Sequence, residues 1–104
     1  MKINISQHAK DRVKERINKL NSHDLKSLTY KAFKFGKTPV HYLLDGNTAM
    51  FDYLSFKQAK HLNKTLRVLN DMIYVFTLEQ PTTLVTVYPI SDEFFRQFKK
   101  RRKY

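Results

Sequence analysis

The spacing of hydrophobic residues changes at Gly36–Pro39, and this change divides the chain into a helical part and an extended part. The apolar residues of the first stretch fall within about 80° of one another around a helix, the spacing of a core-facing stripe. They are Ala9, Val13, Ile17 and Leu20. Beyond Pro39, short runs of β-branched and aromatic residues alternate with turn residues. Because 104 residues support one hydrophobic core, the sequence predicts a single α+β domain over residues 1–104.

Two helices are expected before the change. Ser6 fits the N-cap of a helix that runs to about Leu20, because its oxygen can accept a backbone N–H of the first turn. Ser22 fits the cap of a second helix, which Gly36 would end. The expected apolar face of this second helix consists of Leu25, Leu28, Ala32, Phe33 and Phe35.

An antiparallel sheet of about four strands is expected after the change. Val40–Leu44 and Ala49–Leu54 read as a hairpin around a turn at Asp45–Gly46, and residues 55–64 fit either a helical turn or a loop. The segment 66–69 looks extended, residues 70–71 look like a bend, and Met72–Leu78 has the composition of a strand.

The run Thr83–Tyr88 alternates with period two. Strict alternation places Leu84, Thr86 and Tyr88 on one face of the sheet and Val85 with Val87 on the other. Ser91 then fits the cap of a C-terminal helix that docks through three phenylalanines and ends in a basic tail at residues 99–104. These phenylalanines are Phe94, Phe95 and Phe98.

The formal charge of +11 is concentrated at the two ends of the chain, with +7 over residues 1–37, −1 over 38–98 and +5 over 99–104. Clustered Lys and Arg favour a polyanionic partner, because they release counterions condensed on phosphates. No cysteine is present, which excludes a disulfide framework and a thiol nucleophile. No signal peptide or membrane-length apolar run is visible, so we expect a cytoplasmic protein that does not enter membranes.

His8, Arg12 and Arg16 recur every four residues and spread over about 80° of the first helix, beside its apolar stripe. Such a row can hold phosphates with guanidinium groups while the imidazole moves a proton. The same spacing also suits arginine stems that cover apolar surface and pair with Asp11 and Glu15. Only Gly36 and Gly46 are glycines, so a glycine-rich phosphate loop is excluded. The histidines lack zinc-ligand spacing, and we expect neither a metal nor a cofactor.

The segment Ser6–Arg16 carries the pattern His-Ala-x-x-Arg-x-x-x-Arg, and Asn70–Val75 with Leu84–Pro89 form a pair of closing strands. On these residues the chain resembles the BrnT branch of the RelE/ParE superfamily of small toxins. The resemblance implies a RelE-like domain that cleaves RNA without a metal and is held in check by an antitoxin. It assigns catalytic roles to His8, Arg12, Arg16, Thr86 and Tyr88.

In this interpretation, the RNA backbone would be held by further cations. We expect these to be Lys10, Lys14, Arg67, Lys99, Lys100, Arg101, Arg102 and Lys103. The partner would then be RNA or the ribosome. Two other functions fit the sequence: a non-enzymatic protein of phage or mobile-element origin that binds and inhibits a host protein, and a DNA-binding accessory domain. The sequence also leaves open whether the protein forms a dimer through an exposed strand edge.

Overall fold

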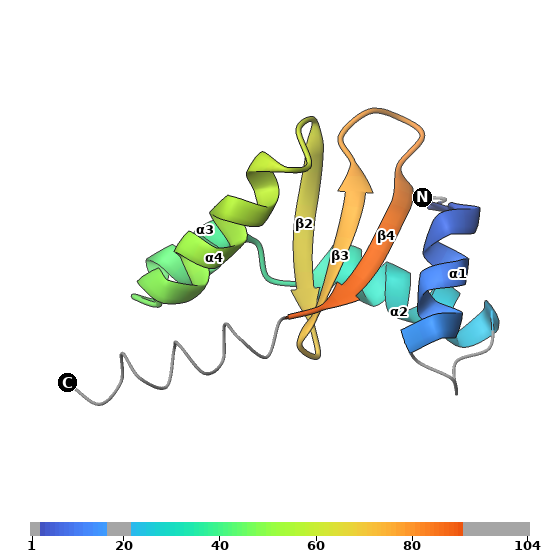
Figure 1. Cartoon of the computed structure of the whole chain (residues 1–104), viewed down its shortest axis with the longest axis horizontal. Helices are drawn as coiled ribbons and strands as arrows, with labels where there is room; N and C mark the ends of the chain where they lie inside the picture. Colours follow the sequence, from blue (N-terminus) through green and yellow to red (C-terminus); the bar gives the residue numbers. More distant parts are fainter. Residues whose placement is uncertain (1–2, 17–21, 91–104) are drawn as a thin grey trace.

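A computed structural model describes residues 3–16 and 22–90 as helices packed around a four-stranded sheet (Figure 1). No helix in these ranges is long and apolar enough to cross a membrane. The expected C-terminal helix and basic tail lie outside the described residues. The elements are β1 (Asn4–Ile5), α1 (Gln7–Arg16), α2 (Ser22–Phe35), α3 (Pro39–Leu44), α4 (Thr48–Ala59), β2 (Lys64–Leu69), β3 (Met72–Thr77) and β4 (Thr83–Pro89).

The sheet is mixed, with strand order β1-β4-β3-β2. β2, β3 and β4 pair antiparallel, as the sequence predicts, whereas the short β1 pairs parallel with β4. The α+β class is therefore confirmed, and an entirely antiparallel sheet is wrong. Asn70 and Asp71 both adopt left-handed backbone conformations, with φ of 52° and 62°. Two such residues in succession form the tight turn that matches the twist of a hairpin, and they join β2 to β3 here.

The expected hairpin over residues 40–54 is wrong, because this segment forms the helices α3 and α4. Thr38 and His41 form a reciprocal capping box at the start of α3, and Pro39 occupies its first turn. The Asn47 side chain accepts a hydrogen bond from the Met50 amide and caps α4. Gly46, at φ 81°, lies in the turn between the two helices. α4 continues to Ala59, so the first half of the segment 55–64 is helical.

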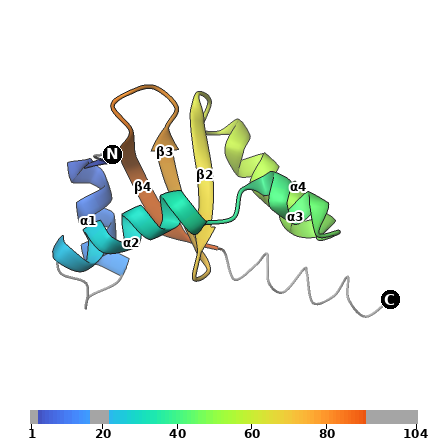
Figure 2. The same cartoon turned by 180° about the vertical axis from the view of Figure 1, so that it is seen from behind.

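A hydrophobic core lies on each face of the sheet. We call the face seen in Figure 1 the front face and the opposite one the rear face. α2 crosses the rear face in Figure 2, and a core forms there from α1, α2 and the sheet, including Phe76, against which Phe33 packs edge-on at 5.3 Å. A second core joins α4 to the front face through Met50 and Leu54. β3 serves both cores, since its four consecutive residues 73–76 are all buried.

A register shift opposite Val75 and Phe76 interrupts the alternation of β4. Leu84 pairs with Phe76 and packs in the rear core, while Tyr88 packs in the front core. The expectation that Leu84 shares a face with Tyr88 is therefore wrong, because the extra residue of a β-bulge reverses the order of faces along a strand. Thr86, which pairs with Val75 of the front core, stays on the same face as Tyr88.

α2 begins at Ser22 and ends at the outer edge of β2. There the Lys37 amide donates to the Val68 carbonyl and the Val68 amide donates to the Lys37 carbonyl, both at 2.9 Å. Phe35 is the last residue of α2 and is 75% exposed, so its expected place in the core is wrong. The helix has reached the rim of the sheet at this residue, and no described element covers the ring.

The Ser6 side chain confirms the expected N-cap of α1 and also fixes this helix to the sheet. Its Oγ accepts a hydrogen bond from the Ala9 amide at 3.0 Å and donates one to the Val85 carbonyl at 2.9 Å. The Ser6 amide donates to the Leu84 carbonyl at 3.0 Å. The start of α1 is thus held against β4, and this attachment determines where the side chains of α1 lie.

Replacing Ser6 with alanine is expected to destabilise the protein by about 1–2 kcal/mol, because it removes both a helix cap and a bond to β4. Urea unfolding monitored by circular dichroism measures the change. Ser27, which is exposed in the middle of α2, provides the matched control, and Ser27→Ala should change stability by no more than about 0.5 kcal/mol. Equal effects of the two substitutions would show that Ser6 does not anchor α1.

Candidate nucleic-acid interface

α1 carries two of the predicted site residues on one flank. Ala9 and Val13 are buried in the rear core. At 100° per residue, Arg12 lies about 60° and His8 about 100° to one side of Ala9, while Lys10 and Lys14 lie on the other side. The Arg12 Nε lies 3.5 Å from the His8 Nε2 and donates a long hydrogen bond to it. His8 is exposed and Arg12 is half-buried.

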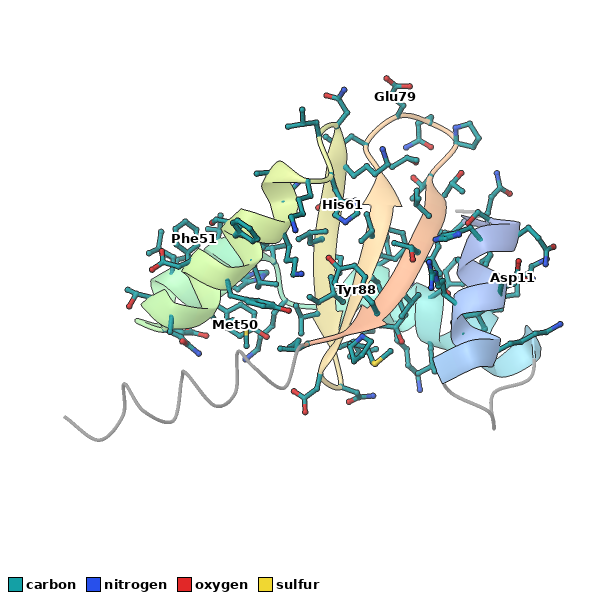
Figure 3. All side chains as sticks on the ribbon, viewed as in Figure 1. Asp11, Met50, Phe51, His61, Glu79 and Tyr88 are labelled. Atoms are coloured by element: carbon teal, nitrogen blue, oxygen red, sulfur yellow. The ribbon has the colours of Figure 1, made fainter. Side chains whose placement is uncertain are left out.

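The His8–Arg12 flank faces the same side of the molecule as Tyr88. α1 runs beside β4 in Figure 1, with Ala9 and Val13 turned toward the rear core. α1 is right-handed and runs downward in Figure 1, so side chains displaced from Ala9 by about 60–100° around the helix, on the side of His8 and Arg12, point to the front. Figure 3 agrees, because Asp11 projects from the outer side of α1, away from the sheet. Of the five predicted catalytic residues, His8, Arg12, Thr86 and Tyr88 thus belong to one side, and the Arg16 side chain lies outside the described residues.

Tyr88 is half-buried against the front core, and its hydroxyl oxygen is buried without a hydrogen-bond partner in the described part of the chain. Burial, and after it the neighbouring Tyr53, raise the pKa of Tyr88 to about 12. The phenol therefore stays protonated at neutral pH. Its predicted role as a surface group that hydrogen-bonds a ribose does not match this buried position.

A cluster that the sequence did not reveal surrounds Tyr88. The His61 ring centroid lies 6.2 Å from that of Tyr88, and Figure 3 shows both residues in front of the sheet between α4 and α1. Lys57 extends its ammonium over two rings, at 5.6 Å from the Tyr53 centroid and 5.7 Å from that of Tyr88. Such distances are typical of cation–π contacts. We call Tyr53, Lys57, His61 and Tyr88 the α4–β4 cluster.

Burial and then the positive charges of Lys64, Lys57 and Lys60 lower the pKa of His61 from its usual 6.5. The imidazole is therefore neutral at pH 7. A depressed folded-state pKa makes His61 contribute stability that is present above pH 6.5 and lost as the pH falls through the folded-state value. All the charged groups that shift this pKa are cations, so the local potential at His61 is positive.

The backbone of His61 is held by several hydrogen bonds just beyond the end of α4. Its amide donates to the Gln58 carbonyl at 2.9 Å, and its carbonyl accepts from the Lys64 amide at 3.2 Å. The Gln58 side-chain amide donates to the His61 carbonyl at 3.0 Å and also to the Lys64 carbonyl. These contacts fix the point from which the imidazole projects.

A second aromatic residue of α4 lies beside a cation. The Lys60 ammonium lies 4.8 Å from the centroid of the Phe56 ring, and Phe56 is 62% exposed. An exposed ring with a neighbouring ammonium offers a stacking surface and a charge to a nucleotide. The sequence alone does not single out Phe56 or Lys60, because the segment 55–64 fits either a helical turn or a loop. On a helix, residues spaced by three or four lie on one flank, as Tyr53, Lys57 and Lys60 do. This helical spacing is the sequence signal that could have identified Lys57 and Lys60.

Several predicted nucleic-acid contacts lie elsewhere. Arg67 is half-buried on the rear side, with its guanidinium 5.5 Å from the centroid of Phe33 and its Nε buried without a hydrogen bond among the described residues. Lys10 and Lys14 are exposed on the flank of α1 opposite His8. The structure therefore does not bring these three together with Tyr88. The five basic residues 99–103 lie outside the described residues.

No family model, no curated protein and no solved structure matches this chain. The likeness to the BrnT branch therefore remains a prediction from the quoted motifs. Within residues 3–16 and 22–90, no three side chains of the types that bind metals gather into a group that could hold an ion.

Replacing Tyr88 with phenylalanine is expected to leave stability unchanged or raise it by up to about 1 kcal/mol, because a buried hydroxyl without a partner is removed. Tyr30 provides the contrast, since its hydroxyl accepts a hydrogen bond from the Ile3 amide at 3.1 Å. Tyr30→Phe should lower stability by about 1 kcal/mol. Urea unfolding of both variants checks the pair, and a marked loss for Tyr88→Phe would reveal an acceptor for its hydroxyl.

Proposed function

We propose that this protein binds RNA across the front side of its sheet. The binding surface consists of the His8–Arg12 flank of α1, the α4–β4 cluster and the adjacent Phe56 and Lys60. The observation that carries the proposal is the Lys57 ammonium, which lies 5.7 Å from the centroid of the Tyr88 ring beside His61, on the side that the His8–Arg12 flank also faces. A site with cations at both borders can follow a phosphate backbone across β4.

Exposed rings favour single-stranded RNA over a duplex. Aromatic side chains stack on unpaired bases whatever their sequence, whereas the bases of a duplex already stack on one another. Phe56 is exposed beside Lys60 and can accept a base in this way. The DNA-binding alternative predicts instead that duplex DNA competes with RNA for this surface.

Metal-independent cleavage of the bound RNA, of the kind found in toxin–antitoxin systems, is the finer proposal that the resemblance implies. Arg12 would stabilise charge on the phosphate, and His8 would take part in binding or proton transfer. Thr86 lies on the front face and can contact the RNA from β4. The buried Tyr88 hydroxyl supports the shape of this surface more readily than contact with a ribose.

Binding of a fluorescent single-stranded RNA should weaken steeply with salt, because phosphate contacts release counterions. We expect Arg12→Ala and Lys60→Ala each to weaken binding about fivefold at low salt and to reduce the salt slope by about one. Lys31, exposed on α2 at the rear, is the matched control, and Lys31→Ala should bind like the wild type. Fluorescence anisotropy measures all three. Equal losses for Lys31→Ala and Lys60→Ala would contradict a defined front surface, and preference for duplex DNA would favour the accessory-domain alternative.

A second candidate function is binding of a protein, either an antitoxin or a host protein. One observation favours it: α3 buries none of its residues, and its apolar side chains Val40, Leu43 and Leu44 are 56%, 44% and 79% exposed. An exposed apolar patch of this kind is typical of an interaction surface.

This candidate predicts a partner that stays bound after nuclease treatment and in about 0.5 M salt, where contacts mediated by RNA are lost. The double substitution Val40→Asp and Leu44→Asp should abolish capture of that partner from cell extract without changing RNA binding. Leu78, 62% exposed beyond the end of β3, gives the control Leu78→Asp. A partner that is released by nuclease, or that both variants retain, would remove the candidate.

A further inference from the structure

We propose that His61 is the catalytic residue that takes the proton from the ribose 2′-hydroxyl when the bound RNA is cleaved. This inference rests on the proposed function, because it requires RNA on the front side of the sheet. It assigns the proton transfer to a residue beyond the end of α4 and leaves His8 and Arg12 as groups that hold the phosphate backbone.

The position of His61 suits this role. Its backbone is fixed by Gln58 and Lys64, so the ring projects from a held point and not from a free loop. The ring is half-buried beside Tyr88 in front of the sheet, and neither of its nitrogens has a hydrogen-bond partner among the described residues. An imidazole in this state offers one nitrogen that can accept a proton and one that carries a proton.

The charges around His61 favour the same reaction. The cations whose charges act on His61 are Lys57 of α4, Lys60 just beyond the end of α4 and Lys64 at the start of β2. The ring of Tyr88 from β4 lies 6.2 Å from the imidazole, centroid to centroid. Together with burial, these cations keep the imidazole neutral at pH 7, the form that a general base requires. The same cations are available to a phosphate that gains negative charge in the transition state.

His8 is less suited to begin the reaction. Its Nε2 accepts the hydrogen bond from the Arg12 Nε, so the lone pair that would take a proton is engaged by a cation. His8 is also exposed, and a general base gains from a position that limits its motion. The pair His8–Arg12 is arranged to bind an anionic oxygen with the guanidinium.

The chemical step is an internal transfer that needs no further reactant. A neutral His61 nitrogen accepts the proton of the 2′-hydroxyl, and the 2′-oxygen forms a bond to the adjacent phosphorus. The bond from phosphorus to the 5′-oxygen breaks, and this oxygen takes a proton from solvent. The products are a 2′,3′-cyclic phosphate and a 5′-hydroxyl, and His61 returns its proton to water.

Single-turnover cleavage of an end-labelled RNA, with saturating protein and EDTA present, tests the proposal. We expect His61→Asn and His61→Gln to slow cleavage by about a hundredfold or more, the usual contribution of a general base. Both variants should weaken binding of a 2′-O-methyl RNA of the same sequence far less than they slow cleavage, since no charge is removed at pH 7. His41, an exposed histidine of α3, provides the matched control His41→Gln, which should cleave at the wild-type rate.

The pH profile supplies a readout that a purely structural role would not change. The wild-type rate should rise with pH through one ionisation below 6.5 and then level off, and this rise should be absent in both His61 variants. Lys57→Ala should move the midpoint to higher pH, because a cation that opposes protonation of His61 is removed.

Each outcome separates this inference from the proposed function. Cleavage by folded His61 variants at the wild-type rate, or loss of the pH-dependent step in His8→Ala alone, would overturn the assignment to His61. A wild-type protein that binds RNA without cutting it would overturn the inference and leave RNA binding intact. Absence of RNA binding by the wild type would overturn both. Circular dichroism and urea unfolding show which variants are folded.

Discussion

β3 must be covered on both faces, and the arrangement of the other elements follows from this requirement. Four apolar or aromatic residues in succession, 73–76, leave the strand without a face that can meet water. α1 and α2 bury the rear side through residues such as Phe76, and α4 buries the front side through residues such as Ile73. Because α3 and α4 lie on the β2 side and α1 lies on the β4 side, the front of β4 becomes the place where both groups of helices contribute polar side chains (Figure 1).

The parts of the fold that the sequence predicted are those with local causes. The cap at Ser6, the strands around the Asn70–Asp71 turn and the end of α2 at Gly36 each depend on neighbouring residues. The strand predicted at Val40–Leu44 was wrong. Its residues favour strands, but the capping box at Thr38 and the packing of α4 on the sheet favour a helix. The bulge in β4 depends on pairing with β3, so an alternation pattern within one strand could not reveal it.

The candidate site likewise has a part that depends on neighbouring residues, which the sequence predicted, and a part that depends on packing, which it did not. A helix with a fixed period was enough to place His8 and Arg12 together, because both lie on α1. Thr86 and Tyr88 were correctly assigned to one face, but burial of the Tyr88 hydroxyl is a property of the packed core. His61 could not be predicted, since its proximity to Tyr88 arises only when the end of α4 is brought to the sheet by the second core.

The outer side of β2 shows how this protein limits growth of its own sheet. Strand edges with unpaired amides and carbonyls recruit further strands, including those of identical chains, and can begin aggregation. Here Lys37 occupies the amide and carbonyl of Val68, and the His61 carbonyl and Gln58 side chain occupy those of Lys64. Leu66, which lies between them, is 0% exposed, so this stretch of β2 offers no open run of backbone groups to a further strand. Of these groups only the Gln58 side chain can be removed by substitution, because His61 contributes its backbone carbonyl, so variants at Gln58 should be judged by solubility as well as by activity.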